Sequence, residues 1–241
     1  MYKAISYLAA ISISLSAFAS NEDVQYSGIN NVTFEQPENN NAFAGNGFLL
    51  EHNTEVYAVT VKHALLEANT PDMRTVSIDG HVVQWQIHPN KEPENTVILG
   101  ELLNASDTEA LDMAILQTDW LVFRVTANNS KLTPVSLRES SLNQGDVVTA
   151  YGCTYANAEV CKQDVYTGLF VAKEGANLRI SMPGLQPSAL RGLSGSPVLD
   201  QNNQLVGIIS NVFRSLDGNG FDLAPANLDY LKQVLSQLER R

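Results

Sequence analysis

The chain has 241 residues, with 15 Lys and Arg against 26 Asp and Glu, which gives a formal net charge of −11. A nucleic-acid-binding protein needs clustered positive charge to replace counterions on phosphates, so this balance argues against one. Apolar residues make up 44% of the chain and charged residues 17%, a composition typical of a protein that buries a core rather than of a disordered chain. The length fits one or two compact domains.

Residues 1–19 have the pattern of a secretory signal peptide, in which Lys3 precedes a short apolar run that ends in small residues at Ala17 and Ala19. A membrane anchor is the alternative, but serines interrupt the run, and it is shorter than the roughly 20 residues that cross a bilayer. We therefore predict cleavage after Ala19 and a secreted or periplasmic protein outside the membrane. Residues 20–44 are rich in Asn and Glu, and predict a polar N-terminal arm that is a pro-segment, an interaction arm or disordered.

Short apolar segments rich in β-branched and aromatic residues follow from Gly45, and turn formers separate them. The predicted strands are 48–50, 56–61, 75–78, 81–87, 113–116, 121–125, 147–151, 165–167, 178–180, 196–199 and 205–209. One helix is predicted within residues 227–241, where leucines and a valine recur at helical spacing and Asn227 can cap the first turn. Many short strands with one C-terminal helix predict an all-β barrel or sandwich, and a polar stretch at 128–130 allows two barrels, over 45–127 and 128–226.

The two cysteines, Cys153 and Cys161, are separated by seven residues. In an exported protein this spacing predicts one disulfide that closes a surface loop and stabilises the fold by roughly 2–3 kcal/mol. A zinc site would need further ligands nearby, and all four histidines lie far upstream. We therefore predict no metal site.

The sharpest local motif is Arg191-Gly-Leu-Ser-Gly-Ser-Pro197, directly before an apolar strand. Glycines on both sides of Ser194 permit a tight turn in which the hydroxyl projects while the amides of Gly192 and Ser194 converge on one point. Converging amides stabilise negative charge that forms on a carbonyl oxygen, as in an oxyanion hole. An ordinary Gly/Ser turn leading into a hairpin is the alternative.

A serine hydroxyl is a weak nucleophile near neutral pH unless a base accepts its proton. His63 follows the apolar strand 56–61, and we expect it to be half-buried and held at the edge of the core; a structural histidine is the alternative. Asp112 is set among apolar residues, where an unpaired carboxylate is unfavourable, so we predict it as the acid that orients His63. Asp107 and Asp119 lie nearby in more polar surroundings, and Asp112 could instead bond to backbone amides.

Chain order separates the hydrolase classes. No histidine follows Ser194, which excludes the order of an α/β-hydrolase, and the only aspartate before His63 is Asp23 in the polar arm, which argues against a subtilisin-like order. The remaining order is histidine, aspartate, serine.

At these residues the sequence resembles the chymotrypsin/trypsin-like serine proteases, in particular their short bacterial members of glutamyl-endopeptidase-like and trypsin-like type. The resemblance covers roughly residues 43–238. It rests on five segments: Gly45–Leu50 as the first core strand, Val59–Ala64 around the histidine, Leu111–Leu116 around the aspartate, Gly192–Pro197 around the serine, and Leu205–Ser210 as the strand after it.

The resemblance implies two six-stranded antiparallel β-barrels with the site in the cleft between them. His63 and Asp112 would come from the first barrel and Ser194, the nucleophile that forms an acyl-enzyme, from the second. Gly192 and Ser194 would supply the oxyanion-hole amides. The family's substrate pocket would draw on Ser188 at its base and on Ser210, Asn211 and Val212 along its wall, and 210–213 would pair with an extended peptide.

Together with the predicted signal peptide, the resemblance implies a secreted serine endopeptidase that acts on proteins or peptides without a cofactor, and we expect a monomer. Leu193 stands where digestive members have the aspartate that pairs with a new amino terminus, so that activation mechanism is not carried over. Ser188 offers no acid to select Lys or Arg, which argues against trypsin-like specificity. A catalytically weak or inactive protease-fold protein that binds a peptide or partner in the cleft is the alternative, and an intact triad argues against it.

Overall fold

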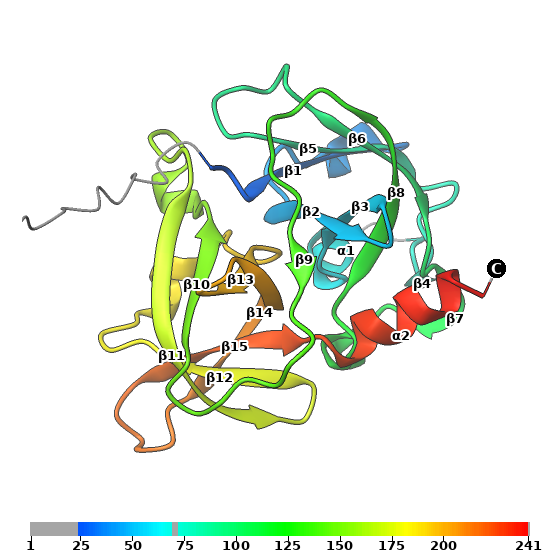
Figure 1. The fold of residues 1–241 in the computed structure, drawn as a ribbon. Helices are drawn as coiled ribbons and strands as arrows, with labels where there is room; N and C mark the ends of the chain where they lie inside the picture. The colour runs from blue at the N-terminus through cyan, green and yellow to red at the C-terminus, as the bar shows by residue number, and fades with distance from the viewer. Residues whose placement is uncertain (1–23, 69–71, 241) are drawn as a thin grey trace, which may run out of the picture.

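The computed structural model describes residues 24–68 and 72–240, which form two β-barrels side by side with a helix at the C-terminal end (Figure 1). The predicted signal peptide and its cleavage site after Ala19 lie outside the described residues. Within those residues, no helix is long and apolar enough to cross a membrane.

The first barrel closes in the order β1-β2-β3-β8-β6-β5, and every neighbouring pair is antiparallel. Its interior is filled by large side chains that the pattern of apolar segments predicts, including the fully buried Phe48, Leu50 and Phe123, beside Trp85. Two further strands pair in a small separate sheet, β4 with β7. The strands of this half are β1 (Ser27–Phe34), β2 (Asn46–His52), β3 (Glu55–Thr60), β4 (Thr75–Val76), β5 (Val82–His88), β6 (Val97–Leu102), β7 (Ser106–Ala110) and β8 (Leu121–Asn128).

The prediction of a polar arm over residues 20–44 is wrong from Ser27 onward, because β1 is a full member of the first barrel. The prediction was wrong because the asparagines of this segment were interpreted as a sign of an exposed arm. Asn30 is completely buried, and its Nδ2 donates hydrogen bonds to the backbone oxygens of Ala44 and Asn46 and to Thr60 Oγ1. Its Oδ1 accepts from Trp85 Nε1 at 2.9 Å. A polar side chain whose bonding capacity is used inside the barrel does not mark an exposed segment.

The second barrel runs β13-β10-β11-β12-β15-β14 and is closed by pairing of β13 with β14, while the short β9 joins β14 in parallel. The predicted fold class, two six-stranded antiparallel barrels with a C-terminal helix, is confirmed. The strands of this half are β9 (Ser136–Leu137), β10 (Val147–Gly152), β11 (Asp164–Glu174), β12 (Asn177–Ser181), β13 (Pro197–Asp200), β14 (Gln204–Arg214) and β15 (Phe221–Asn227).

The C-terminal helix α2 (Asp229–Leu238) lies against the first barrel (Figure 1). Its buried side chains, Leu231, Val234 and Leu235, belong to the same core cluster as the strands of that barrel. Asn227 Oδ1 accepts a hydrogen bond from the Asp229 amide at 2.9 Å, so Asn227 satisfies one amide of the first turn as expected.

Several short helical segments were not expected. α1 (His63–Ala68) follows β3 directly, and residues 113–116, predicted as a strand, lie in the 3₁₀ helix η2 (Met113–Gln117). Three other 3₁₀ segments occur in loops: η1 (Pro37–Asn39), η3 (Tyr155–Asn157) and η4 (Pro187–Leu190).

Candidate active site

His63 and Asp119 lie next to each other in the first barrel, one just after the end of a strand and the other just before the start of the neighbouring strand. His63 starts α1 just after β3, and Asp119 lies just before β8, which pairs with β3 through Thr60 and Leu121. The two atoms His63 Nδ1 and Asp119 Oδ2 are 2.7 Å apart, and the backbone amide of His63 donates to Asp119 Oδ1 at 3.0 Å. The carboxylate is completely buried, whereas 13% of the His63 side chain is exposed.

A third group reaches Asp119 from the second barrel. Ser210 Oγ on β14 donates a hydrogen bond to Asp119 Oδ2 at 2.5 Å. Burial on its own would raise the pKa of Asp119, but the hydrogen bonds and charge attraction from His63, with the bond from Ser210, outweigh it and hold that pKa below its ordinary value of 3.8. Asp119 therefore stays ionised and fixes the orientation of the His63 ring.

The prediction that Asp112 orients His63 is wrong. Asp112 is exposed at the N-cap of η2, where its Oδ1 accepts a hydrogen bond from the Ala114 amide at 2.7 Å. The apolar residues after it do not form a core strand, since Met113 is 69% exposed. Asp119 instead precedes the buried run 120–123, but the sequence does not show this directly, because four apolar residues follow each of the two aspartates.

A buried hydrogen-bond network centred on Lys62 joins the residue before His63 to the residue before Asp119. Lys62 is fully buried, and its Nζ donates to both carboxylate oxygens of Glu109 at 2.7 and 2.9 Å. The same ammonium donates to Thr118 Oγ1 and to Tyr230 Oη on α2. Because Lys62 and Thr118 immediately precede His63 and Asp119, the network links the two backbone segments that carry these functional side chains. Sequence analysis did not identify it.

Ser194 lies on the loop between η4 and β13, where the second barrel meets the first. Its carbonyl oxygen accepts a hydrogen bond from the Asn46 amide at the start of β2, at 2.7 Å. The next residues pair with β14: the Gly195 amide donates to Ile209 O, and the Ile209 amide donates to Ser196 O, both at 2.9 Å. Ile209 directly precedes Ser210, so Ser194 lies next to the strand that reaches Asp119.

Gly195 permits this close approach of the two barrels. Its φ angle is +83°, and a Cβ atom on it would lie 1.9 Å from the backbone oxygen of Asn46. No residue with a side chain fits there without displacing β2.

The peptide groups around Ser194 are held by hydrogen bonds on one side. The carbonyl of Arg191 accepts from the Tyr155 amide at 2.9 Å, and the carbonyl of Leu193 accepts from the Ser196 amide at 3.1 Å. In a planar trans peptide the N–H points opposite to the C=O, so the amides of Gly192 and Ser194 point away from these contacts. Neither amide donates a hydrogen bond within the described part of the chain.

A type II turn sets the position of Gly192. Arg191 has φ −56° and ψ 132°, Gly192 has φ +91°, and the Leu193 amide donates to the Leu190 carbonyl at 2.9 Å. The third position of such a turn requires positive φ, which explains the glycine.

The four residues predicted to bind substrate fall into two groups. Ser210, Asn211 and Val212 are half-buried on β14, and beyond Ile209 that strand pairs only with β15 among the described strands. Among the strands that the structure describes, none therefore pairs with one edge of the segment 210–213. Ser188, predicted at the base of a pocket, is instead exposed on η4 and does not line the 450 Å³ cavity between residues 181–186 and 215–222.

The predicted disulfide between Cys153 and Cys161 is present, and it closes the loop after β10 that contains Tyr155. Within residues 24–68 and 72–240, no three His, Cys, Asp or Glu side chains cluster in a way that could hold a metal ion.

Comparison with known families agrees with this geometry. Residues 45–208, which include His63, Asp119 and Ser194, match the trypsin-like peptidase domain. The chain belongs to the trypsin-like peptidase family. No curated protein matches this trypsin-like peptidase by sequence.

Solved structures share the fold at low sequence identity. A Glu endopeptidase solved with MPD has a TM-score of 0.58 and 15% identity, with 90% of this chain and 92% of that chain covered. The thermostable serine protease AL20 from an extremophilic microorganism has a TM-score of 0.58 and 13% identity, with 90% and 97% covered. The HtrA-type protease AlgW, solved with a decapeptide, has a TM-score of 0.52 and 20% identity, with 82% of this chain and 52% of that chain covered.

Proposed function

We propose that this trypsin-like peptidase is an exported serine endopeptidase whose catalytic triad is Ser194, His63 and Asp119. The observation that carries the proposal is the chain of hydrogen bonds from His63 Nδ1 to the buried Asp119 and on to Ser210, directly beside the loop that bears Ser194. A binding protein needs a cleft, but it does not need an ionised carboxylate that fixes a histidine tautomer. The disulfide supports export, because disulfides persist in oxidising compartments.

In the first half-reaction, Ser194 Oγ attacks the carbonyl carbon of the scissile peptide bond while His63 Nε2 accepts the hydroxyl proton. Asp119 keeps the other imidazole proton on Nδ1 and stabilises the imidazolium that forms. The C–N bond then breaks, His63 returns its proton to the leaving amine, and an acyl-enzyme remains on Ser194.

In the second half-reaction, water adds to the acyl carbon as His63 accepts one of its protons. The bond to Ser194 Oγ breaks, the proton returns to that oxygen, and the carboxylic acid leaves. The amides of Gly192 and Ser194 would stabilise the oxyanion in both steps, and the absence of another acceptor for them among residues 24–68 and 72–240 supports this role.

The unpaired edge of β14 supports an extended protein or peptide substrate. A peptide that adds as a strand along 210–213 would form backbone hydrogen bonds with this segment. The binding affinity would then come from the main chain of the peptide rather than from particular side chains. The position of Ser210 would couple this edge to Asp119, since its hydroxyl already bonds the carboxylate.

Hydrolysis of an unfolded protein tests the proposal. Reduced and alkylated casein is incubated with the protein and with Ser194→Ala, and the new peptide termini are identified by mass spectrometry. We expect internal cleavage by the wild type and none by Ser194→Ala. Equal cleavage by both, or none by either when both are folded, would refute the proposed activity.

A further inference from the structure

Asn46 occupies a position between the two barrels that the mechanism above does not use. It begins β2 in the first barrel, and its side chain is buried with 1% of the residue exposed. Its backbone amide donates to the Ser194 carbonyl at 2.7 Å, so it already touches the residue proposed as the nucleophile.

The Asn46 side chain makes three hydrogen bonds across the barrel interface. Its Nδ2 donates to the Gly192 carbonyl at 2.7 Å and to the Cys153 carbonyl at 2.9 Å, and its Oδ1 accepts from the Cys153 amide at 2.9 Å. Both N–H groups and the carbonyl oxygen of the Asn46 side chain are hydrogen-bonded, and every partner is backbone. One side chain thus joins the turn before Ser194 to the first cysteine of the disulfide.

The bond to the Gly192 carbonyl acts on a peptide between the two proposed oxyanion-hole amides. That peptide, Gly192–Leu193, is fixed at both ends, by Asn46 at its oxygen and by the Leu190 carbonyl at its nitrogen. If it rotated, the amides of Gly192 and Ser194 on either side would change their orientation relative to each other. An oxyanion hole depends on donors fixed before the reaction, so such a rotation would weaken it.

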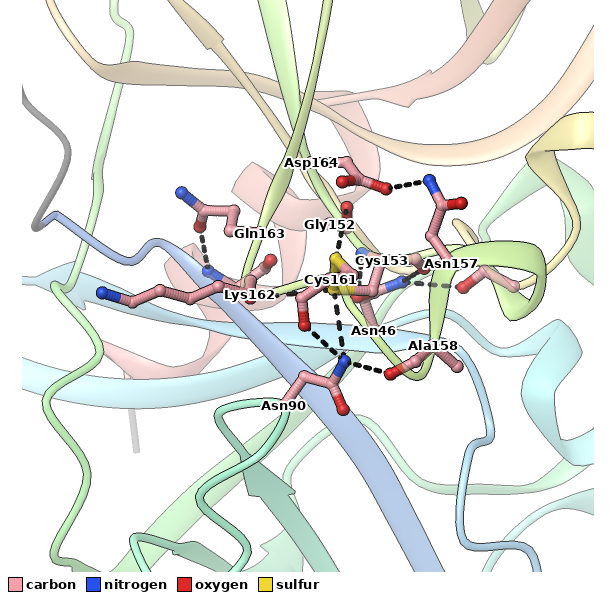
Figure 2. Close-up of a disulfide and its surroundings, with 12 residues drawn as sticks. Asn46, Asn90, Gly152, Cys153, Asn157, Ala158, Cys161, Lys162, Gln163 and Asp164 are labelled. Atoms are coloured by element: carbon pink, nitrogen blue, oxygen red, sulfur yellow. Dashed lines mark hydrogen bonds between the residues drawn. A yellow bond between two sulfur atoms is a disulfide. The ribbon is translucent and has the colours of Figure 1, made fainter.

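The disulfide loop holds the preceding peptide. Cys153 is bonded on both sides by Asn46, and two residues later the Tyr155 amide donates to the Arg191 carbonyl, which fixes the Gly192 amide. Figure 2 shows Asn46 next to the disulfide, with Asn90 bonded to the Ala158 and Cys161 carbonyls of the same loop. The loop and Asn46 therefore hold consecutive peptides of the same turn.

We propose that Asn46 is a positioning residue that holds the oxyanion-hole turn at residues 191–194 against the Cys153–Cys161 loop. This inference rests on the proposed function of the same site. Asn46 acts through Gly192 and does not touch the reacting atoms, so its loss lowers the rate of acyl transfer without weakening the binding of substrate.

The test compares Asn46→Asp and Asn46→Ser with the wild type. Aspartate keeps the shape but places an oxygen against the two carbonyls, and serine is too short to reach both. Asn227→Asp and Asn227→Ser are matched controls, because Asn227 is also buried and its side chain donates to the Gly175 carbonyl and accepts from the Asp229 amide, both at 2.9 Å. The readouts are the rate of reaction with a fluorophosphonate, kcat and KM for 4-nitrophenyl acetate, and the folded fraction by near-UV circular dichroism.

Per folded molecule, we expect both Asn46 variants to react with the fluorophosphonate at least about tenfold more slowly. The value of kcat should fall by a similar factor, whereas KM should stay within about threefold of the wild-type value. This loss of rate is smaller than the loss that removal of an oxyanion-hole donor itself causes. The Asn227 variants should stay within about twofold. If Asn46→Asp does not fold, Asn46→Ser carries the test. A wild type that reacts while folded Asn46→Ser reacts equally fast overturns this inference alone. A folded wild type that does not react overturns the proposed function and this inference with it.

Discussion

Replacement of Asp119 by asparagine should abolish most of the activity through the tautomer of His63. The carboxylate accepts three hydrogen bonds: Oδ1 from the His63 backbone amide, and Oδ2 from His63 Nδ1 and Ser210 Oγ. The backbone amide of His63 can only donate and cannot rotate away, so the asparagine oxygen will occupy the position of Oδ1 and accept its hydrogen bond. The NH₂ group will then face His63 Nδ1. The imidazole ring must then carry its proton on Nε2, and a protonated Nε2 can no longer accept the proton of Ser194.

In a Ser-His-Asp triad, an asparagine that replaces the aspartate and holds the histidine in the wrong tautomer lowers kcat by about 10⁴-fold, equivalent to about 5.4 kcal/mol of transition-state stabilisation. The assay is kcat for 4-nitrophenyl acetate at neutral pH, with Asp112→Asn as the matched control. Asparagine caps a helix about as well as aspartate, so Asp112→Asn should keep kcat within about twofold. A large loss in Asp112→Asn together with near-normal activity in Asp119→Asn would refute the assignment of the acid.

Three further outcomes follow from the described contacts. Lys62→Met leaves Glu109 without its buried partner and should lower the free energy of unfolding by about 3 kcal/mol, measured by urea denaturation, whereas a change within experimental error would contradict the role of the network. Replacing both Cys153 and Cys161 by serine should lower that free energy by about 2–3 kcal/mol and slow fluorophosphonate labelling, and unchanged labelling would show that the loop does not hold the turn. Although burial opposes it, bonding holds the pKa of Asp119 below 3.8, so its ionised form stabilises the fold above that pH and this contribution is lost as the pH falls through the folded pKa. The stability of the wild type should therefore fall more steeply than that of Asp119→Asn below about pH 4, and parallel curves would contradict the shift.

The two-barrel fold was predictable because alternating short apolar segments report burial directly. Phe48, Phe123 and Leu205 all lie in predicted strands and are fully buried. β1 was missed because its polar residues are satisfied inside the barrel, as Asn30 shows. Hydrogen-bond partners that come from distant strands leave no local mark on the sequence.

The aspartate was misassigned for a related reason. Asp112 and Asp119 are both followed by apolar residues, and composition alone does not distinguish a surface 3₁₀ helix from a barrel strand. Only pairing of β8 with β3 brings Asp119 next to His63. The family resemblance implied that Ser210 lies along the wall of the substrate pocket, and the structure adds that its hydroxyl donates a hydrogen bond to Asp119.

Active-site labelling tests the central claim most directly. The folded, disulfide-intact protein and Ser194→Ala are treated with a fluorophosphonate, and the modified residue is located by mass spectrometry. The account predicts a single phosphonylated residue, Ser194, and no labelling of Ser194→Ala. Absence of labelling in the folded wild type, or labelling at another serine that persists in Ser194→Ala, would contradict it.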